Sequence, residues 1–383
     1  MADKFDCPLR TKGCGGCSLI TLPYPEQLKQ KQLQVTELLG SFGPIHPIIG
    51  MDNPWHYRNK AISSFAVQNH QLISGIYMQG THRVIPVTQC LLHQPALDKA
   101  IEAVRRAARA CHYEVFNEDR RTGLLRHILA RYSRANDEIL VTLVTAKAAL
   151  PGSKFFVKEL RTQCPQISTV IQNINPRYSS AVLGPNEKIL FGKGFIEDRL
   201  CQLKFRISAS SFYQINPEQT EKLYRTAISM AKLDGHQTVL DAYCGIGTIG
   251  LIAAQNAFKL IGVESNPQAV SCAIQNARNN HIKNAHFYCE DATAFLQKMT
   301  LKRQHVDILF LDPPRAGSTT EFLDSICRIS PQKVIYISCN PQTQQRDLHF
   351  LCHRGWKVIE IQPVDLFPHT EHIETIALLQ PTI

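Results

Sequence analysis

One cysteine stands at the end of an apolar run that has the length of a buried strand. Residues 334–343 read VIYISCNPQT, and Cys339 comes shortly before Pro341, which forbids a continuing strand. In open α/β sheets, ligands bind at the carboxyl ends of the strands. A thiol at such an end can act as a covalent nucleophile, although a cysteine that only packs in the core is the alternative.

Carboxyl groups stand at two further strand ends. VDILFLDPPR contains a second apolar run, and Asp312 follows it directly. LFPHTEHIETIALL contains Glu371 and Glu374, and Glu374 stands just before the last apolar strand. A carboxylate beside a covalent adduct can remove a proton from the substrate and so release the thiol.

A thiol and a carboxylate at one sheet edge suit methylation of C5 of a uracil. C5 is a poor nucleophile, but thiolate addition at C6 turns it into an enolate carbon that can attack a sulfonium methyl group. A base must then remove the C5 proton and expel the thiol. Enzymes that methylate exocyclic amines carry an aromatic residue after the two prolines, where this chain has Arg315. His369 and His372 could alternatively bind a metal ion, but no third ligand has a clear spacing.

The segment TVLDAYCGIGTIG predicts a loop that carries a nucleoside cofactor. Gly245, Gly247 and Gly250 follow an apolar strand and begin a helix, so the backbone can approach a ligand closely. Glu264 ends the next strand, where a carboxylate can accept both ribose hydroxyl groups. Asp291, with its acidic neighbour, ends the third strand and could hold an adenine amino group. This succession resembles the class I S-adenosylmethionine-dependent methyltransferases, and another Rossmann enzyme is the alternative.

Three kinds of segment position these residues. After residue 208 strands and helices alternate, which is typical of a doubly wound α/β domain, and Asn216 is the expected N-cap of its first helix. Residues 55–206 show the short alternating runs of an antiparallel β-rich domain, interrupted by one helix at 94–110. Residues 20–43 predict an amphipathic helix with Leu28, Val35, Leu38 and Leu39 on one face.

The composition is that of a soluble globular protein with a polyanionic partner. The length of 383 residues favours two domains, and the net charge of +10 favours nucleic acid as the partner. No apolar run is long enough to span a bilayer, and the N-terminal segment lacks the apolar region of a secretory signal. We therefore expect a cytoplasmic protein.

Several segments resemble the signature motifs of the RNA uracil-C5 methyltransferases. DAYCGIGTIG, DPPRAG, YISCNP and FPHTEHIE occur in the order expected for that family. SFYQINPEQ matches the family's Phe-x-Gln-x-Asn segment, and YRNKA and GLLRHILAR resemble segments of its central domain. The resemblance covers essentially the whole chain and implies an enzyme that uses S-adenosylmethionine to methylate uridines in RNA.

The resemblance also implies a role for each residue that matches a motif. Cys339 is the expected nucleophile, Glu374 the expected base, and Asp312 would hydrogen-bond the uracil or the cofactor. Thr248 departs from the pattern, since many family members have Asn there. The positions that match cofactor-binding residues of the family are Gln214, Tyr243, Thr248, Glu264, Asp291 and Asp312.

Three of the 13 cysteines stand close together near the N-terminus. CPLRTKGCGGC contributes Cys7, Cys14 and Cys17, and Cys90 could be a fourth ligand. Four thiolates can hold either a zinc ion or a [4Fe–4S] cluster, and the spacing leaves both open. The resemblance implies a [4Fe–4S] cluster at these four positions. Apart from Cys339, the other cysteines are interpreted as core residues.

The cysteine arrangement bears on the RNA substrate. It resembles that of the bacterial 23S rRNA enzymes, whereas the bacterial tRNA T-loop enzyme usually lacks it and some archaeal tRNA enzymes carry it. Cys7 comes so early that we expect the N-terminal OB-like TRAM domain of many rRNA enzymes to be absent. We expect methylation of 23S rRNA. The alternatives are the same methylation of tRNA and a catalytically inactive RNA-binding or assembly factor.

RNA contacts are then expected in the central domain. A basic run can neutralise phosphates without reading the sequence, although a solvated strand face is the alternative. The run comprises Arg120, Arg121, Arg126, His127, Arg131 and Arg134. The expected RNA-binding residues are Arg58, Lys60, Arg126, His127 and Arg131.

These features predict an α/β protein with two domains. Residues 1–19 and 44–207 are expected to form a β-rich RNA-binding domain with the iron–sulfur site. Residues 208–383 are expected to form a Rossmann-like domain, with a mostly parallel doubly wound sheet and an antiparallel C-terminal strand. The helix at 20–43 is expected to pack on the latter. We expect a monomer that binds RNA, but neither DNA nor a membrane.

Overall fold

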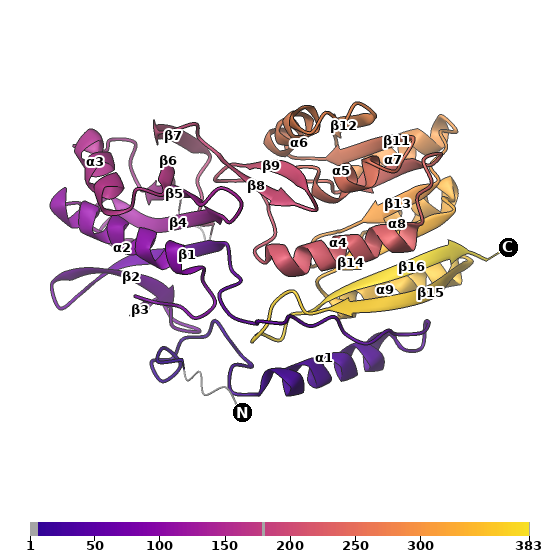
Figure 1. The fold of residues 1–383 in the computed structure, drawn as a ribbon, viewed down its shortest axis with the longest axis horizontal. Coiled ribbons are helices and arrows are strands. Elements are labelled where there is room, and N and C mark those ends of the chain that lie inside the picture. Colours follow the sequence, from indigo (N-terminus) through magenta and orange to yellow (C-terminus); the bar gives the residue numbers. More distant parts are fainter. Residues whose placement is uncertain (1–6, 178–180, 383) are drawn as a thin grey trace. The chain divides into compact units, whose positions relative to one another are not determined.

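The computed structural model describes residues 7–177 and 181–382 of the chain (Figure 1). These residues fall into two compact units. Unit 1 contains the described residues of 1–20, 54–199 and 206–210, and unit 2 contains those of 21–53, 200–205 and 211–383. The largest segment of unit 1, the described part of 54–199, is therefore inserted, in sequence, between two parts of unit 2.

Unit 2 is built on a mixed sheet, which confirms the predicted Rossmann-like fold. The strand order among the described residues is β12-β11-β10-β13-β14-β16-β15. The strands are β10 (Thr238–Ala242), β11 (Lys259–Glu264), β12 (Ala285–Cys289), β13 (Ile308–Leu311), β14 (Lys333–Ser338), β15 (Trp356–Val364) and β16 (Glu374–Pro381). Neighbouring strands are parallel from β12 to β14, and β16 is antiparallel to both β14 and β15. The expected antiparallel C-terminal strand is thus β16.

Polar side chains cap most of the helices that follow residue 210 in unit 2. These helices are α4 (Pro217–Ala231), α5 (Thr248–Ala254), α6 (Pro267–Asn279), α7 (Ala292–Leu301), α8 (Thr320–Ile329) and α9 (Pro341–His353). The exception is α5, whose N-cap residue is Gly247 and which has no side-chain cap. Side chains accept a backbone N–H at the N-caps of α4, α6, α7, α8 and α9, which are Asn216, Asn266, Asp291, Thr319 and Asn340. Three of these caps, Asn266, Asp291 and Asn340, come two residues after the end of a strand. Each therefore limits the loop between that strand and the next helix to a few residues.

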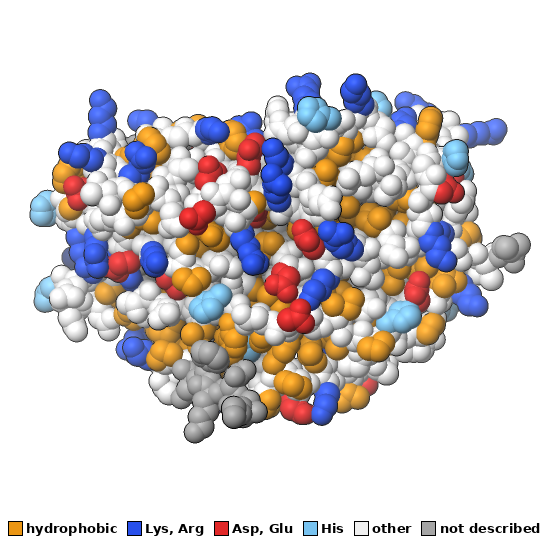
Figure 2. All heavy atoms as spheres, viewed as in Figure 1, with side chains coloured by type: hydrophobic (Ala, Val, Ile, Leu, Met, Phe, Trp, Pro, Cys, Tyr) orange, Lys and Arg blue, Asp and Glu red, His pale blue; other side chains and the backbone are white. Residues whose placement is uncertain are grey.

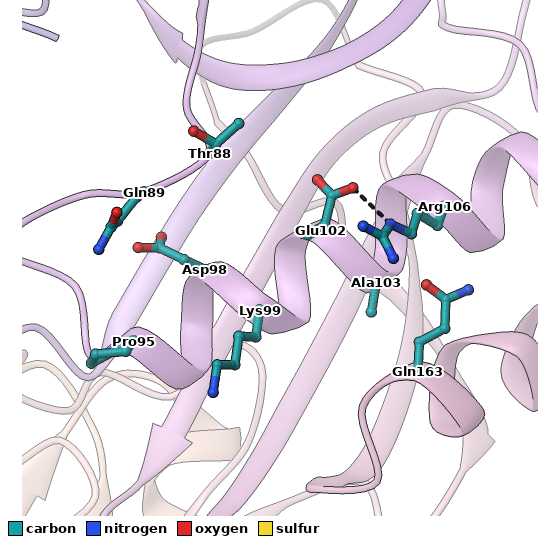
Figure 3. A pocket seen from close by; sticks show the side chains of 9 residues that line it. All are labelled: Thr88, Gln89, Pro95, Asp98, Lys99, Glu102, Ala103, Arg106 and Gln163. Atoms are coloured by element: carbon teal, nitrogen blue, oxygen red, sulfur yellow. Dashed lines mark hydrogen bonds and ion pairs between the residues drawn. The ribbon is translucent and has the colours of Figure 1, made fainter. Parts of the chain in front are cut away.

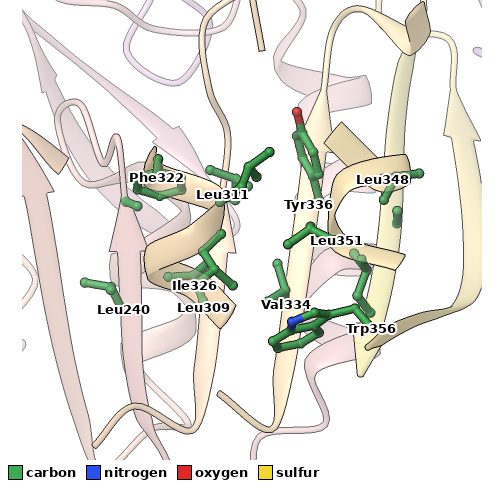
Figure 4. Close-up of a cluster of buried hydrophobic side chains, with 14 of the residues drawn as sticks. Leu240, Leu309, Leu311, Phe322, Ile326, Val334, Tyr336, Leu348, Leu351 and Trp356 are labelled. Carbon is green, nitrogen blue, oxygen red and sulfur yellow. The ribbon is translucent and has the colours of Figure 1, made fainter. Parts of the chain in front are cut away.

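The helix α1 (Tyr24–Leu39) belongs to unit 2. Val35 and Leu39 are fully buried in the same apolar core as the strands. Figure 4 shows part of this core, where Val334 of β14 lies beside Leu351 of α9. The buried face of α1 differs from the expected one, because Gln27 and Lys31 are buried with Val35 and Leu39, whereas Leu28 and Leu38 are half-buried.

Unit 1 contains a second sheet with the order β3-β2-β1-β4-β5-β6-β7. Its strands are β1 (Lys60–Gln68), β2 (Gln71–Tyr77), β3 (Val84–Pro86), β4 (Leu125–Ser133), β5 (Glu138–Thr145), β6 (Ile167–Ile174) and β7 (Asn186–Phe191). The helix α2 (Pro95–Ala110) corresponds to the expected one. The helix α3 (Ser153–Gln163) was not predicted, and its crossover makes β6 parallel to β5. The remaining pairs are antiparallel.

Two boundaries differ from the prediction. Residues 44–53 lie in unit 2 because Ile45 and Ile49 form parallel bridges to Ile361 and Val364 of β15. The hairpin of β8 (Ile196–Leu200) and β9 (Leu203–Ile207) forms a separate two-stranded sheet. Residues 200–205 at its turn also belong to unit 2. Among the described residues, no helix has both the length and the apolar character of a membrane span.

Candidate active site

Cys339 lies at the end of β14 because the next two residues begin α9. The Asn340 side chain accepts a hydrogen bond from the Gln342 amide at 3.2 Å, which caps the helix. The same side chain donates from Nδ2 to the carbonyl oxygen of Arg315 at 3.1 Å. One asparagine therefore joins the SCNP turn to the DPPR turn, and it leaves the Cys339 side chain half-buried.

Glu374 begins β16 next to this thiol. The antiparallel register ends with the pair Ser338 and Thr375; Cys339 directly follows the first and Glu374 directly precedes the second, and the charge of Glu374 acts on the thiol. The Glu374 side chain is buried. Burial raises its pKa well above the usual value, and the charge of Asp312 raises it further, whereas Arg315 lowers it. A carboxyl group with a raised pKa can exchange a proton with a substrate near neutral pH.

Asp312 follows β13 at the same sheet edge. Burial raises the pKa of Asp312 to about 7. Its charge acts on Cys339 and Glu374, since it raises the pKa of both groups. The structure therefore brings together the thiol and the two carboxyl groups that the sequence placed at three separate strand ends.

Arg315 supplies the positive charge at this site. The pKa of Cys339 is raised to about 11, first by burial and then by the charges of Glu374 and Asp312. Arg315 opposes this shift through its charge and a hydrogen bond to the thiol. Its Nη2 also lies 3.3 Å from Nε2 of His372. The resting thiol is therefore neutral, and the guanidinium is the group that favours its thiolate.

The loop after β10 leaves open space for a ligand. Gly245 has φ 56°, and a Cβ atom there would meet no other atom within 4 Å. The Gly245 amide donates to Oε2 of Glu264 at 3.2 Å, and the Asn266 amide donates to Oε1 at 2.8 Å. Glu264 is thus fixed beside the open part of the loop, as the cofactor prediction requires.

The third glycine of the loop has a packing role that involves a residue missed in the sequence. The Gly250 amide donates to Oδ2 of Asp241 at 3.0 Å, and a Cβ at Gly250 would lie 2.6 Å from that oxygen. Asp241 is buried, and burial raises its pKa well above the usual value, with the charges of Asp312 and Glu264 adding to the shift. The helix α5 can therefore approach β10 closely.

Tyr224 of α4 is a second residue that sequence reasoning missed. Its hydroxyl lies 3.3 Å from Oγ1 of Thr248 and is hydrogen-bonded by Gln214. Burial raises the pKa of Tyr224, and the charge of Asp312 raises it further. The Tyr224 hydroxyl is therefore near three positions that match the family's cofactor-binding residues, which are Gln214, Thr248 and Asp312. Nothing in the residue pattern of α4 sets Tyr224 apart from the other residues of the helix.

Tyr243 and Asp291 are two further positions that match the family's cofactor-binding residues. The Tyr243 ring is half-buried, with its centroid 5.4 Å from that of Phe322. Burial raises the pKa of Tyr243 to about 12, with contributions from the charges of Asp291 and Asp347. The exposed Asp291 caps α7 by accepting a hydrogen bond from the Ala294 amide at 3.0 Å.

A cavity of about 570 Å³ opens onto the thiol. Cys339, Arg315 and His372 line it from the strand-end loops, and Gln30 and Gln34 line it from α1. The cavity at Cys339 is therefore lined by the helix α1 together with loops from the C-terminal half of the chain. Sequence reasoning assigned α1 a packing role only.

Polar contacts fasten α1 to the segment that precedes Glu374. The Lys31 ammonium pairs with Asp365 at 2.6 Å, and both side chains are almost completely buried, at 1% and 0% exposure. Burial lowers the pKa of Lys31, whereas Asp365 raises it. Gln27 accepts a hydrogen bond from the His369 amide at 2.9 Å. His369 and His372 therefore engage different neighbours, Gln27 and Arg315.

Two predicted RNA-binding arginines of unit 1 lie inside the fold, which corrects their assignment. Arg126 is 6% exposed and donates from Nη1 to the carbonyl oxygens of Asn175 and Arg177. Arg131 is 4% exposed and donates to the carbonyl oxygen of Ala209 at 3.3 Å. The two side chains are five positions apart on β4, which is buried over most of its length, and both reach backbone carbonyl groups of unit 1.

The other residues of that prediction are half-buried. The pKa of Lys60 is lowered to about 8 and that of His127 to about 4, in both cases chiefly by burial. His127 Nδ1 lies 3.0 Å from Oγ of Ser64. Arg120, Arg121 and Arg134 of the basic run are exposed. Figure 2 shows Lys and Arg side chains interspersed with Asp and Glu across the visible face.

The four cysteines that are predicted to bind the cluster lie close enough together for their charges to act on one another. Burial raises the pKa of Cys17 to about 12, and the charges of Cys90, Cys14 and Cys7 add to the shift. Cys7, Cys14 and Cys90 also pack against the same small apolar cluster. Among residues 7–177 and 181–382, no group of three or more His, Cys, Asp or Glu is placed to hold a metal ion. The [4Fe–4S] cluster therefore stays a prediction.

Arg58 and His93 face these thiols. Arg58 lowers the pKa of Cys17 and Cys14 by its charge, so it lies beside the cysteines rather than on an open RNA surface. His93 hydrogen-bonds Cys90, and its Nδ1 lies 2.8 Å from Asp98. Asp98 also lines a separate cavity of about 460 Å³ along α2 (Figure 3), which contains none of the predicted catalytic residues.

Comparison with known proteins shows which protein family the chain matches. The family described as tRNA (Uracil-5-)-methyltransferase matches residues 23–382. An uncharacterized RNA methyltransferase of Bacillus cereus is 41% identical, over 98% of this chain and 82% of that protein. One from Halalkalibacterium halodurans is 40% identical over the same shares.

A solved structure also covers most of the chain. It is the crystal structure of Pyrococcus abyssi tRNA (uracil-54, C5)-methyltransferase in complex with S-adenosyl-L-homocysteine. The likeness has a TM-score of 0.78 and 25% sequence identity, over 96% of this chain and 86% of that one.

Proposed function

The chain belongs to the tRNA (uracil-5-)-methyltransferase family, whose members are S-adenosylmethionine-dependent RNA methyltransferases, and we propose that it methylates C5 of a uridine in 23S rRNA. The observation that most supports this reaction is that Cys339 and Glu374 adjoin the Ser338–Thr375 pair at the edge where β13 and β14 end, with the charge of Glu374 acting on the thiol. The target RNA and the individual residue roles are part of the proposal.

Cys339 starts the reaction by attacking C6 of the uracil. Its sulfur forms a bond to C6 as the thiol proton leaves to a nearby carboxylate, and the electron pair of the C5–C6 double bond becomes an enolate at C5. Arg315 supports this step, since its charge favours the thiolate. S-adenosylmethionine, when bound, supplies the methyl group that C5 accepts, and S-adenosylhomocysteine leaves.

Glu374 completes the reaction. Its carboxylate takes the C5 proton, the electron pair of the C5–H bond re-forms the C5–C6 double bond, and the bond between C6 and Cys339 breaks. The thiolate is thereby returned. A buried base with a raised pKa suits this step, because it holds the abstracted proton near neutral pH.

The residues around the loop fit a cationic nucleoside cofactor. Open space lies above Gly245, and Glu264 is fixed beside it as an acceptor for ribose hydroxyl groups. Carboxyl groups at Asp241 and Asp312 suit the positive charge of a sulfonium. We propose that the cofactor is held by Gln214, Tyr243, Thr248, Glu264, Asp291 and Asp312.

We further propose that Cys7, Cys14, Cys17 and Cys90 hold a [4Fe–4S] cluster. The packing of Cys7, Cys14 and Cys90 against one small apolar cluster supports this, because it keeps three of the four thiols near one another, with Arg58 as a cation beside Cys14 and Cys17. Such a cluster would join the N-terminal segment to the Cys90 loop. A brown protein with absorbance near roughly 400 nm would support the cluster, and a colourless protein with stoichiometric zinc would overturn it.

The choice of RNA rests on separate observations. The cysteine arrangement resembles the bacterial 23S rRNA enzymes, which supports rRNA. The family description and the Pyrococcus abyssi structure carry the word tRNA, which favours a tRNA uridine as the second candidate. In either RNA the target base must leave its stack before Cys339 can reach C6.

Tritium release tests the reaction and the substrate together. 23S rRNA and tRNA transcripts are labelled separately with [5-³H]uridine and incubated with the protein and S-adenosylmethionine. Release from 23S rRNA alone supports the proposal, and release from tRNA alone keeps the chemistry but replaces the substrate. No release from either RNA, with a Cys339→Ala variant as the blank, would overturn the methylation and favour an RNA-binding factor.

A further inference from the structure

We propose that Gln30 and Gln34 of α1 contact the nucleotides that flank the target uridine and help to select the site of methylation. The inference rests on the proposed function, because it takes the Cys339 cavity as the place that receives the uracil. The two glutamines belong to a helix that no catalytic step requires, so their role would be substrate choice.

Two cavities meet at these glutamines. The cavity at Cys339 and a second cavity of about 690 Å³ along α1 share Gln30 and Gln34. The second cavity continues past Glu26 and Leu33. An RNA strand whose target base occupies the cavity at Cys339 can therefore continue along α1. The nucleotides next to the target base then lie against the two glutamines.

The amide groups of both glutamines are available to a ligand. Gln30 is exposed and Gln34 half-buried, and neither side chain has a hydrogen-bond partner within residues 7–177 and 181–382. By contrast, Gln27 binds His369, and Oε1 of Gln32 accepts a hydrogen bond from the Ile48 amide at 2.7 Å. One pair of glutamines on α1 holds the fold together, and the other pair faces the cavities.

The chemistry of this track fits bases better than phosphates. A carboxamide both donates and accepts, so it can match the edge of a base or a 2′-hydroxyl group. Glu26 and Glu37 line the second cavity, and Lys29 is paired with Glu26 at 2.8 Å, so the track offers little attraction for phosphates. Leu33 is 61% exposed and gives an apolar surface for the face of an unstacked base.

The helix α1, which carries Gln30 and Gln34, is held in a fixed position relative to Glu374, the proposed general base. The Lys31–Asp365 pair and the Gln27–His369 contact hold α1 against the segment that leads into Glu374. Gln30 and Lys31 are neighbours in the helix, so a nucleotide held by Gln30 is positioned with respect to Glu374 through the rigid helix.

The experiment compares Gln30→Ala/Gln34→Ala with wild type and with Gln297→Ala. Gln297 is an exposed glutamine on α7 that lines neither cavity. Short tritiated RNAs contain the target uridine, and each flanking base is replaced in turn. We expect the double variant to lose roughly tenfold in kcat/KM on the natural sequence, mainly through KM, and to lose the wild-type preference at a flanking position.

Binding of S-adenosylhomocysteine and thermal stability should match wild type, which separates base reading from damage to the fold. If the double variant equals Gln297→Ala in both kcat/KM and flanking-base preference, the inference is wrong. Absence of tritium release by wild type on every RNA would instead defeat the proposed function, and that result appears before any variant is made.

Discussion

Cys339 directly follows Ser338, and Glu374 directly precedes Thr375, the residue pair that ends the antiparallel ladder between β14 and β16. The proposed nucleophile and the proposed base are therefore each one residue away from the hydrogen-bonded register of two buried strands. A covalent mechanism needs both groups at one pyrimidine, on C6 and on C5, and adjacent strand positions supply that arrangement.

Replacing Cys339 by Ala should abolish methylation without loss of fold. The side chain is half-buried and small, so the change leaves little cavity and little lost burial. Tritium release should fall to the level of a reaction without protein, whereas S-adenosylhomocysteine should bind as to wild type. Release at more than a few per cent of the wild-type rate would show that another group forms the adduct.

Replacing Glu374 by Gln should separate adduct formation from product release. The amide cannot take the C5 proton, so turnover should fall by roughly 10²–10⁴-fold, the usual range for loss of a general base. Cys339 can still add to the uracil, so a protein–RNA adduct should accumulate and be visible on a denaturing gel. Turnover close to wild type would move the base to another group, with Glu371 the first to be tested.

The raised pKa of Asp312 predicts that it lowers stability as pH rises. The unfolded carboxyl loses its proton near pH 4, but the folded one keeps it until about 7, so the folded state binds more protons in between. The free energy of unfolding should therefore fall from about pH 4 to 7 through this group. Urea unfolding of Asp312→Asn should show a weaker fall, and an unchanged pH profile would contradict the burial of this charge.

Breaking the Lys31–Asp365 pair from one side should destabilise unit 2. Lys31→Met leaves a buried carboxylate unpaired, which costs about 3–5 kcal/mol. Denaturant unfolding measures this loss. The double variant Lys31→Met/Asp365→Asn should recover part of it, because the unpaired charge is then removed. A double variant no more stable than Lys31→Met would show that the Asp365 charge is not the cause.

The basic residues of unit 1 should divide into two classes. Arg126→Ala should lower stability, because the buried side chain satisfies two carbonyl groups. The exposed pair Arg120→Ala/Arg121→Ala should leave stability unchanged but weaken RNA binding and reduce its salt dependence, if these residues contact phosphates. Binding measured across a salt series distinguishes the classes, and an unaltered slope would remove the pair from the interface.

Local patterns were sufficient to predict that Cys339 and Asp312 lie at one sheet edge. Each follows an apolar run, and strand–helix alternation predicts that such strand ends share one edge. The cap Asn216 was likewise predicted from a short motif.

Other features depend on contacts between distant residues. Lys31 meets Asp365 across 334 positions, and no periodicity along α1 indicates a buried lysine. The alternation in β4 shows that Arg126 and its neighbours face opposite ways, but not which face is buried. The helix α3 has no side-chain N-cap, and only Phe156 and Leu160 of it are buried, so its local signal is weak.

The contact between α1 and Asp365 also affects how the protein is made. A ribosome adds roughly 5–20 residues per second, so Lys31 is synthesised about 20–60 s before the carboxylate that neutralises it. During that interval α1 lacks the C-terminal strands on which it packs, whereas the last segment of unit 1 ends at residue 210 and is made about midway through. The newborn chain can therefore fold unit 1 first, and unit 2 can fold only when nearly the last residue has been added.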